Sequence, residues 1–425
     1  MSAAAPGLAE LTRVFARIGV MSFGGPAAQI ALMHRELVDL RPWLTERQFL
    51  NALSFTMLLP GPEAMQLATY AGWRLAGPLG GLIAGLLFVL PGAAVILVLA
   101  AFYTSLGQLP LVSAMFLGIK AAVAVIVVQA LIKVAGRALK SSIAYGLAGA
   151  AFVAIYVFDV PFPIVIVAAA AIGALAMAGE PGDAVFPPRV SGLVRTAVLW
   201  LAIWLLPLGA LWLLAPGSLL AEVGLFFSKL AVVTFGGAYA VLAYMVQEVV
   251  ADFGWLTTGQ MMDALGLAET TPGPLILVTE FVGFLAGAQE GGFGLGLAAA
   301  IVTLWVTFAP CFLWIFLGAP YVEWIGGQPR LTGALSGITA AVVGVILNLS
   351  VWFVLNVLFT AVARVSVGPA ALWVPDWATF QPGAFLLIGL AALLLFWRKM
   401  DLLVVLGLLA LAGIGWRFAI APVLG

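Results

Sequence analysis

The chain has 425 residues, of which 64% are hydrophobic and only 8% are charged, and its formal net charge at pH 7 is zero. About a quarter of the residues of a soluble domain are charged, so this composition excludes a water-soluble globule and predicts an all-helical, polytopic membrane protein. One cysteine, Cys311, and one histidine, His34, exclude a disulfide framework and a metal site rich in these residues. We expect no cofactor, no metal, no nucleic-acid partner and no cleaved signal peptide.

A membrane-spanning helix needs about 20 consecutive apolar residues, and thirteen segments of the sequence meet or approach this requirement. They lie near residues 8–33, 47–73, 76–103, 110–134, 141–158, 161–178, 193–214, 220–247, 259–285, 293–318, 331–361, 383–397 and 400–423. The first is interrupted by Phe23-Gly24-Gly25-Pro26, so it is either a full crossing, which we favour, or a re-entrant hairpin. Lys and Arg are commoner in the loops on the side of the N-terminus, which places that terminus in the cytoplasm.

The same motifs occur twice, 212 residues apart. Phe23-Gly24-Gly25 recurs as Phe235-Gly236-Gly237, and Pro60-Gly61-Pro62 recurs as Pro272-Gly273-Pro274. We therefore predict two homologous six-segment repeats joined by one linker span. This odd span would invert the second repeat, as in many secondary transporters, although a parallel repeat follows if one weak span of the first half does not cross. The predicted domains are an N-terminal repeat at 1–180, a linker with its connecting span at 181–218 and a C-terminal repeat at 219–425.

The two glycine pairs predict breaks within membrane helices. A break is tolerated only where protein or water satisfies the freed backbone groups. The N–H groups at the start of the new helix, together with the positive end of its dipole, favour an anion. Each pair follows a hydroxyl residue, Ser22 or Thr234, and Pro26 suits the first turn of a helix. Close packing of spans is the alternative, but recurrence at matching positions favours a binding site.

The two Pro-Gly-Pro motifs predict a second pair of breaks. Proline removes a backbone donor and disfavours a helical conformation of the residue before it. Polar residues adjoin both motifs, with Glu63 and Gln66 after the first and Glu269, Thr270 and Thr271 before the second. The alternative is a kink that lines no site. We favour breaks that line a site, because the motif recurs beside polar residues.

Charged side chains within spans are costly and point to function. Arg17 and Lys229 are repeat equivalents, and each lies seven residues before its glycine pair, which places it on the same helix face as the break. Snorkelling to the interface is their alternative role. Lys120 lies in mid-span and needs either an anionic substrate or a structural partner such as Glu63. Glu63 and Glu280 are candidate proton carriers, because a carboxylate removed from water binds a proton near neutral pH.

The candidate substrate-binding residues combine both kinds of break with these charges. They are Arg17, Ser22, Phe23, Gly24, Gly25, Pro60, Gly61, Pro62, Glu63, Gln66, Lys120, Lys229, Thr234, Gly236, Gly237, Thr271, Pro272, Gly273 and Pro274. We predict no catalytic residue.

Several of these motifs together resemble the chromate ion transporter family in its two-domain form. They are Phe23-Gly24-Gly25-Pro26, His34-Arg35-Glu36, Trp43, Leu59-Pro60-Gly61-Pro62-Glu63-Ala64 and the run 66–72. The resemblance covers almost the whole chain and implies export of chromate, a tetrahedral dianion, across the bacterial inner membrane, with chromate resistance as a result. The second copy has Leu275 and Ala238 in place of Glu63 and Pro26, so we expect one asymmetric site.

Several alternatives remain open at this point. Sulfate has the same shape and charge as chromate, so transport of sulfate or another oxyanion is the main one. Uniport and proton antiport both agree with the sequence, and so does a homodimer in the lipid bilayer. A membrane-embedded, lipid-modifying enzyme is a remote alternative, because a single histidine and the lack of a metal-binding motif count against it. We therefore expect a transporter and not an enzyme.

Overall fold

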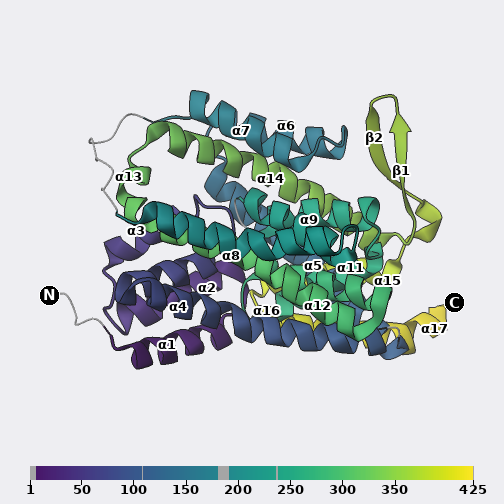
Figure 1. Ribbon diagram of the computed structural model, residues 1–425. Coiled ribbons are helices and arrows are strands. Elements are labelled where there is room, and N and C mark those ends of the chain that lie inside the picture. Colours follow the sequence, from purple (N-terminus) through teal and green to yellow (C-terminus); the bar gives the residue numbers. More distant parts are fainter. Residues whose placement is uncertain (1–5, 108, 180–190, 236–237, 425) are drawn as a thin grey trace. The chain divides into compact units, whose positions relative to one another are not determined.

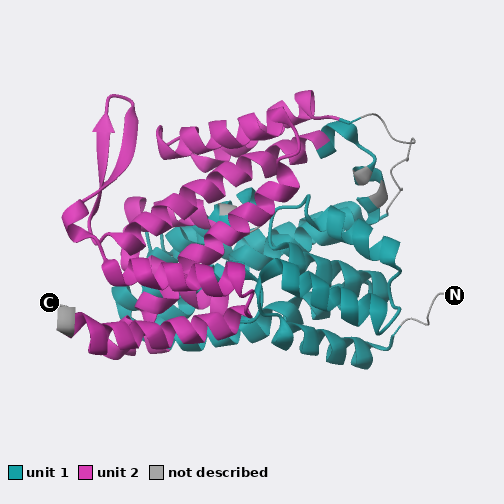
Figure 2. Cartoon of the chain, turned by 180° about the vertical axis from the view of Figure 1, so that it is seen from behind, with its two compact units in different colours: residues 1–101, 179–241, 271–332 teal, residues 102–178, 242–270, 333–425 magenta. Residues whose placement is uncertain are grey.

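The computed structural model describes residues 6–107, 109–179, 191–235 and 238–424, most of which are helical. The chain forms two compact units (Figure 2). Unit 1 comprises Met1–Ala101, Gly179–Val241 and Thr271–Thr332, and unit 2 comprises Phe102–Ala178, Leu242–Thr270 and Gly333–Gly425. Each unit contains segments from both halves of the sequence, so the compact units cut across the predicted repeats.

Unit 1 is built from helices that range from one short turn to a long hairpin (Figure 1). In chain order they are α1 (Leu8–Met21), α2 (Gly25–His34), η1 (Arg35–Asp39), α3 (Glu46–Thr56), most of α4 (Glu63–Leu106), α8 (Leu193–Leu214), α9 (Leu219–Val233), the start of α10 (Ala238–Gln247), η3 (Leu275–Leu277), α12 (Val278–Gly318), η4 (Ala319–Tyr321), α13 (Val322–Gly326) and the start of α14 (Pro329–Leu358). Helix α12 packs against α8 and α9, and α13 packs against α3.

Unit 2 contains further helices and one hairpin of strands. They are the end of α4, α5 (Pro110–Ala138), α6 (Ser142–Tyr156), α7 (Phe162–Ala176), most of α10, η2 (Glu248–Asp252), α11 (Thr258–Thr270), most of α14, β1 (Val362–Val367), β2 (Ala370–Pro375), η5 (Trp377–Thr379), α15 (Pro382–Ala392), η6 (Leu393–Trp397), α16 (Leu402–Gly415), η7 (Trp416–Ile420) and α17 (Ala421–Leu424). The antiparallel strands project from the helices as a hairpin, with Val362 opposite Pro375 (Figure 1). Helix α5 packs against α11, α15 and α16.

The long helix α4 doubles back on itself at Ala76 and Gly77, whose backbone angles are not helical. A Cβ atom on Gly85 would lie 2.4 Å from Thr69 Oγ1. Residues this far apart in a straight helix are separated by about 24 Å along the axis, so the two arms of α4 must run antiparallel. Glycine at the crossing lets the arms approach closely.

Helix α12 repeats this construction in the second half of the chain. Gly291 and Gly292 have φ/ψ angles of −140°/20° and 76°/−171°, close to the −142°/28° and 65°/−161° of Ala76 and Gly77. A Cβ atom on Gly283 would lie 2.3 Å from Thr303 Oγ1, which again brings two arms side by side. The repeated sequence therefore produces two matching helical hairpins, both in unit 1.

Six helices among the described residues are long and apolar enough to cross a membrane. They are Glu63–Leu106, Pro110–Ala138, Leu193–Leu214, Leu275–Tyr321, Pro329–Leu358 and Leu402–Ile420, and shorter apolar helices lie at Ser142–Tyr156, Phe162–Ala176 and Pro382–Trp397. In the span Leu193–Leu214 only 6% of the most apolar window is buried, as expected of a helix that faces lipid. The chain is a multi-pass membrane protein.

Four predicted spans, 8–33, 47–73, 220–247 and 259–285, are divided between shorter helices in the structure. Gly24 divides the first, the third is divided between α9 and α10, and the Pro-Gly-Pro motifs divide the second and fourth. Helices α1, α2, α3, α9, α10 and α11 have 10 to 15 residues, so each is shorter than the hydrocarbon layer and is not by itself a full crossing. The prediction of thirteen single crossings is therefore not reproduced.

Candidate functional site

The first break separates α1 from α2 and has the backbone conformation that only glycine adopts easily. Gly24 and Gly25 have φ angles of 82° and 75°, and a proline lies in the first turn of α2. No side chain caps the start of this helix. Gly24 is exposed and Gly25 is partly exposed, so the amide end of α2 is accessible.

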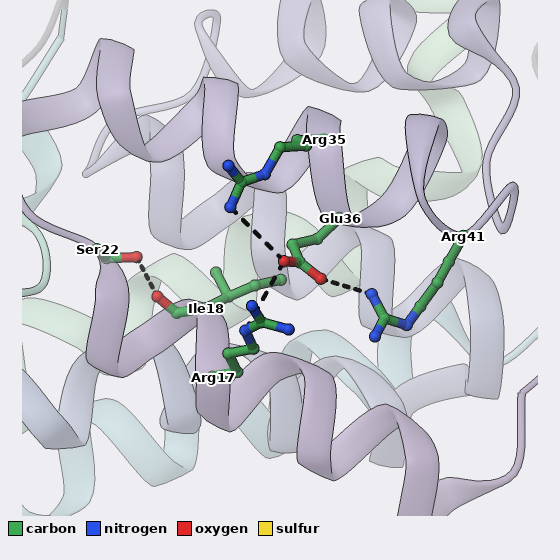
Figure 3. Close-up of polar contacts among 6 residues, drawn as sticks. All are labelled: Arg17, Ile18, Ser22, Arg35, Glu36 and Arg41. Carbon is green, nitrogen blue, oxygen red and sulfur yellow. Dashed lines mark hydrogen bonds and ion pairs between the residues drawn. The ribbon is translucent and has the colours of Figure 1, made fainter.

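The chain folds back at this break. Arg17 Nε in α1 lies 3.9 Å from Glu36 Oε1 in η1, as Figure 3 shows. A straight helix would separate these residues by about 28 Å, far beyond the reach of two side chains. The segment 8–33 is therefore a helical hairpin and not one continuous helix. The glycines reverse the chain direction, and the sequence pattern alone did not reveal the angle.

The hydroxyl groups before the glycine pairs donate hydrogen bonds to their own helices and do not point into an open site. Ser22 Oγ donates to the carbonyl oxygen of Ile18 at 2.6 Å (Figure 3), and Thr234 Oγ1 donates to that of Leu230 at 2.6 Å. Each hydroxyl therefore caps the last turn of its own helix by a bond to the fourth residue before it. Both residues are buried. Gly236 and Gly237, the second predicted pair, lie outside the described residues.

Each Pro-Gly-Pro break is hydrogen-bonded to the glycine-pair break of the other repeat. The Gly61 N–H donates to the Thr234 carbonyl at 2.7 Å, and the Gly273 N–H donates to the Ser22 carbonyl at 2.8 Å. Because Gly61 and Gly273 are repeat equivalents, as are Ser22 and Thr234, one contact is made twice with the repeats exchanged. We call these four residues, all in unit 1, the crossed junction. It satisfies backbone groups that the breaks free from helix hydrogen bonds.

The crossed junction is closely packed in this conformation. A Cβ atom on Gly61 would lie 2.7 Å from Gln66 Nε2 and 2.9 Å from Cys311 Sγ, and one on Gly92 would lie 2.2 Å from the Pro272 carbonyl oxygen. An anion therefore needs a local opening to reach the junction. The two breaks differ in access, since the segment 271–274 is wholly buried whereas Glu63, in the first turn of α4, is partly exposed.

Two glutamines of the first repeat complete the junction. Gln29 Nε2 donates to the carbonyl oxygens of Gly273 at 2.7 Å and Ser22 at 3.2 Å, and Gln66 Nε2 donates to that of Pro60 at 2.7 Å. Their Oε1 atoms are buried without a hydrogen-bond partner. Gln66 was predicted from the sequence and Gln29 was not, although a lone amide in an apolar helix was a usable signal. At the 212-residue offset their counterparts are Val241 and Val278, so only the first repeat supplies amides.

A cluster of three arginines surrounds the buried carboxylate of Glu36 (Figure 3). Arg41 Nη1 donates to Glu36 Oε2 at 2.5 Å, and Arg17 and Arg35 each lie 3.9 Å from Oε1. Three guanidinium groups around one carboxylate leave a local excess of positive charge. The side chains of Arg17 and Arg35 are 55% and 53% exposed, so this excess faces outward and attracts anions. The cluster also holds the α1–α2 hairpin closed.

Lys229, the repeat equivalent of Arg17, is likewise exposed. It lies in α9 between Ser228 and Leu230, which are buried. Glu280, by contrast, is buried in the first arm of α12, and its Oε2 atom has no hydrogen-bond partner.

Lys120 belongs to unit 2 and has a partner that the sequence analysis did not name. Its Nζ atom lies 2.9 Å from Asp263 Oδ1 in α11, and Tyr103 Oη donates to Asp263 Oδ2 at 2.7 Å. Asp263 is buried, with 7% of its surface exposed. Lys120 was predicted to be functional because it is a charge within an apolar span. Asp263 is also a charge within a predicted span, 259–285, so the same reasoning could have found it.

The comparisons with known proteins agree with the sequence motifs. A family model described as chromate transporter matches residues 9–174 and 221–416. A probable chromate transport protein of Synechococcus elongatus is 31% identical over 96% of this chain and 95% of the relative. Chromate transport proteins of Cupriavidus metallidurans and Pseudomonas aeruginosa are 30% and 33% identical, over 80% and 79% of this chain and the same shares of those proteins.

No solved structure matches the chain. The matched regions cover most of both halves of the sequence, and the relatives are named as transport proteins and not as enzymes. The chain therefore belongs to the chromate transporter family.

Proposed function

We propose that this protein exports chromate across the bacterial inner membrane as a secondary transporter and thereby confers chromate resistance. Support comes from the family and from the names of the relatives. The observation that carries the mechanism is the crossed junction, in which the broken helices of the two repeats are joined by one contact made twice. Broken helices at matching positions of two repeats are where secondary transporters bind substrate.

The proposed anion site uses the amide ends of the broken helices. Helix α2 starts at Gly25 without a side-chain cap, and α4 starts directly after Pro62. The first N–H groups of a helix have no partner within it, so these groups and the positive dipole ends of both helices favour a dianion without a permanently charged side chain. Arg17 and its cluster raise the local concentration of anions by long-range attraction.

The two reciprocal hydrogen bonds suggest how access alternates. In inverted repeats, one half takes the conformation that the other half has just left. We infer that the Ser22–Gly273 bond and the Thr234–Gly61 bond open in turn, one on each side of the bound anion. The exposed Gly24 and the wholly buried segment 271–274 fit a conformation in which the first glycine pair is more accessible than the second Pro-Gly-Pro motif.

The membrane potential supplies a driving force for export. Moving charge across a membrane changes the free energy by about 2.3 kcal/mol per elementary charge per 100 mV, and a negative interior expels a dianion. Uniport is therefore sufficient. Proton coupling through Glu63 or Glu280 is an additional step, and Glu63→Gln and Glu280→Gln test it through the pH dependence of transport.

The direct test is transport in proteoliposomes that contain the purified protein. We expect saturable uptake of labelled chromate that increases when an imposed potential favours movement of the anion. Unlabelled sulfate added in excess tests selectivity, because it has the same shape and charge. Weak competition supports chromate as the substrate, equal competition makes this a general transporter of tetrahedral oxyanions, and the absence of any chromate flux overturns the proposal.

A further inference from the structure

The ion pair of Lys120 and Asp263 lies beside a cavity in unit 2. The cavity has a volume of about 700 Å³, and polar side chains on its wall include Lys120, Thr258, Asn356, Asp376 and Gln381. Pockets that hold small ligands usually have volumes of about 300–1,000 Å³. Neither the family match nor the junction in unit 1 assigns a role to this cavity.

Lys120 faces both the cavity and Asp263. Its side chain is 21% exposed, whereas that of Asp263 is 10% exposed. An ammonium group has three hydrogen-bond donors, so contact with one carboxylate oxygen leaves donors for a ligand in the cavity. Tyr103 holds the other carboxylate oxygen, Oδ2, and so keeps Oδ1 turned toward the lysine.

We propose that this cavity binds a tetrahedral oxyanion that competes with Asp263 for Lys120, and that Asp263 takes up a proton when the anion binds. The inference rests on the proposed function for the identity of the anion. A buried carboxylate that loses its cation is strongly unfavourable, and a second anion beside it adds repulsion. One proton taken from the buffered solution and bound at Oδ1 removes both costs, while the Tyr103 hydrogen bond to Oδ2 is kept.

Few titratable groups near the cavity could take up this proton in place of Asp263. Helix α11 packs against α5, which supplies Lys120, and Tyr103 comes from the last turns of α4. Lys120 and Tyr103 are the titratable side chains that act on Asp263. Asp376 is another acid on the described cavity wall and provides a matched control. At the 212-residue offset Asp263 corresponds to Asn51, so the exchange has no counterpart in the first repeat.

The test measures chromate binding to the full-length protein in detergent by equilibrium dialysis between pH 6 and 8. One linked proton strengthens wild-type binding by up to about tenfold for each unit of pH decrease. Asp263→Asn should bind chromate at least as tightly and lose this pH dependence, whereas Asp376→Asn should keep the wild-type profile. Chromate itself takes up a proton in this range, so the readout is the difference between the wild-type and Asp263→Asn profiles.

A double variant distinguishes loss of chromate binding from loss of folding. Lys120→Ala leaves Asp263 as an unpaired buried charge, so Lys120→Ala/Asp263→Asn, which lacks both charges, is compared with Asp263→Asn. The double variant should fold and lose binding in the cavity. Equal pH dependence in wild type and Asp263→Asn, or full binding in the double variant, overturns the inference even if transport is normal. Absence of chromate flux in the wild-type protein overturns the proposed function instead.

Discussion

The crossed junction of unit 1 and the Lys120–Asp263 pair of unit 2 are built in opposite ways. The junction consists of backbone groups, occurs in both repeats and has nearly the same hydrogen-bond lengths in each, 2.7 and 2.8 Å. The ion pair consists of side chains and occurs once, because neither residue is repeated. Lys120 corresponds to Thr339 at an offset of 219 residues, which holds in this later part of the repeat, and Asp263 corresponds to Asn51 at the offset of 212. In this protein the duplicated sequence preserves the framework of broken helices, whereas charge is placed in only one copy.

The largest expected effect comes from breaking the Lys120–Asp263 ion pair, which is present in only one repeat. Lys120→Ala should destabilise the protein by about 3–5 kcal/mol, because it leaves the buried Asp263 carboxylate without its cation. Lys120→Ala/Asp263→Asn should recover most of this lost stability. Thermal unfolding of the two variants in detergent measures the difference. Equal stability of the single and double variants would show that the pair is not a buried ion pair.

The junction should respond equally in its two copies. Gly61→Ala and Gly273→Ala each force a Cβ onto a backbone with φ of 123° or 90° and into contacts shorter than 3 Å. We expect each change to destabilise the protein by more than about 2 kcal/mol. Gly77→Ala is the control, because its φ is also positive at 65° but no atom lies within 4 Å of the added Cβ. That variant should lose only about 1 kcal/mol, and unequal effects of the two junction variants would contradict the reciprocal contact.

Variants in the arginine cluster distinguish a structural role from electrostatic attraction of the substrate. Glu36→Gln should destabilise the protein by about 2 kcal/mol, because it removes the carboxylate that balances three arginines around the α1–α2 hairpin. Arg35→Gln is expected to cost less than about 1 kcal/mol, since its pair is long and exposed. If Arg17 attracts the substrate, Arg17→Gln should weaken chromate binding several-fold with little change in unfolding temperature, and the change should shrink as salt is raised.

The smallest expected effect is a pH dependence at the end of α2. A hydrogen bond from His34 Nε2 to Glu46 Oε2 at 2.7 Å is the main cause that raises the pKa of His34, with a further contribution from Asp39. The stabilisation is present below the unfolded pKa of about 6.5 and is lost as pH rises through the raised folded value. We expect the pair to contribute less than about 1 kcal/mol to the free energy of unfolding, because such exposed pairs are weak. His34→Gln should remove this pH dependence of the unfolding temperature, whereas Arg47→Gln should leave it unchanged.

The sequence predicted a helical membrane protein with breaks at both motifs, and the helices do end at these positions. Composition and the limits that proline and glycine impose on the backbone suffice for such predictions. The reversal at Gly24 was not predictable, because a break in a helix does not specify the angle between its two parts. Asp263 was missed although it is a charge in an apolar span, and its pairing with Lys120 depends on packing between helices distant in sequence.

The central claim is that the two kinds of break meet at a site for the transported anion. Cryo-electron microscopy of the protein in lipid nanodiscs with chromate, bound to a rigid antibody fragment, tests it directly. The account predicts density for a tetrahedral anion within about 2.7–3.2 Å of the amide nitrogens near Gly25 or Gly61. It also predicts that one of the two hydrogen bonds, Ser22–Gly273 or Thr234–Gly61, is broken while the other persists. Two intact bonds with the anion bound elsewhere would contradict the account.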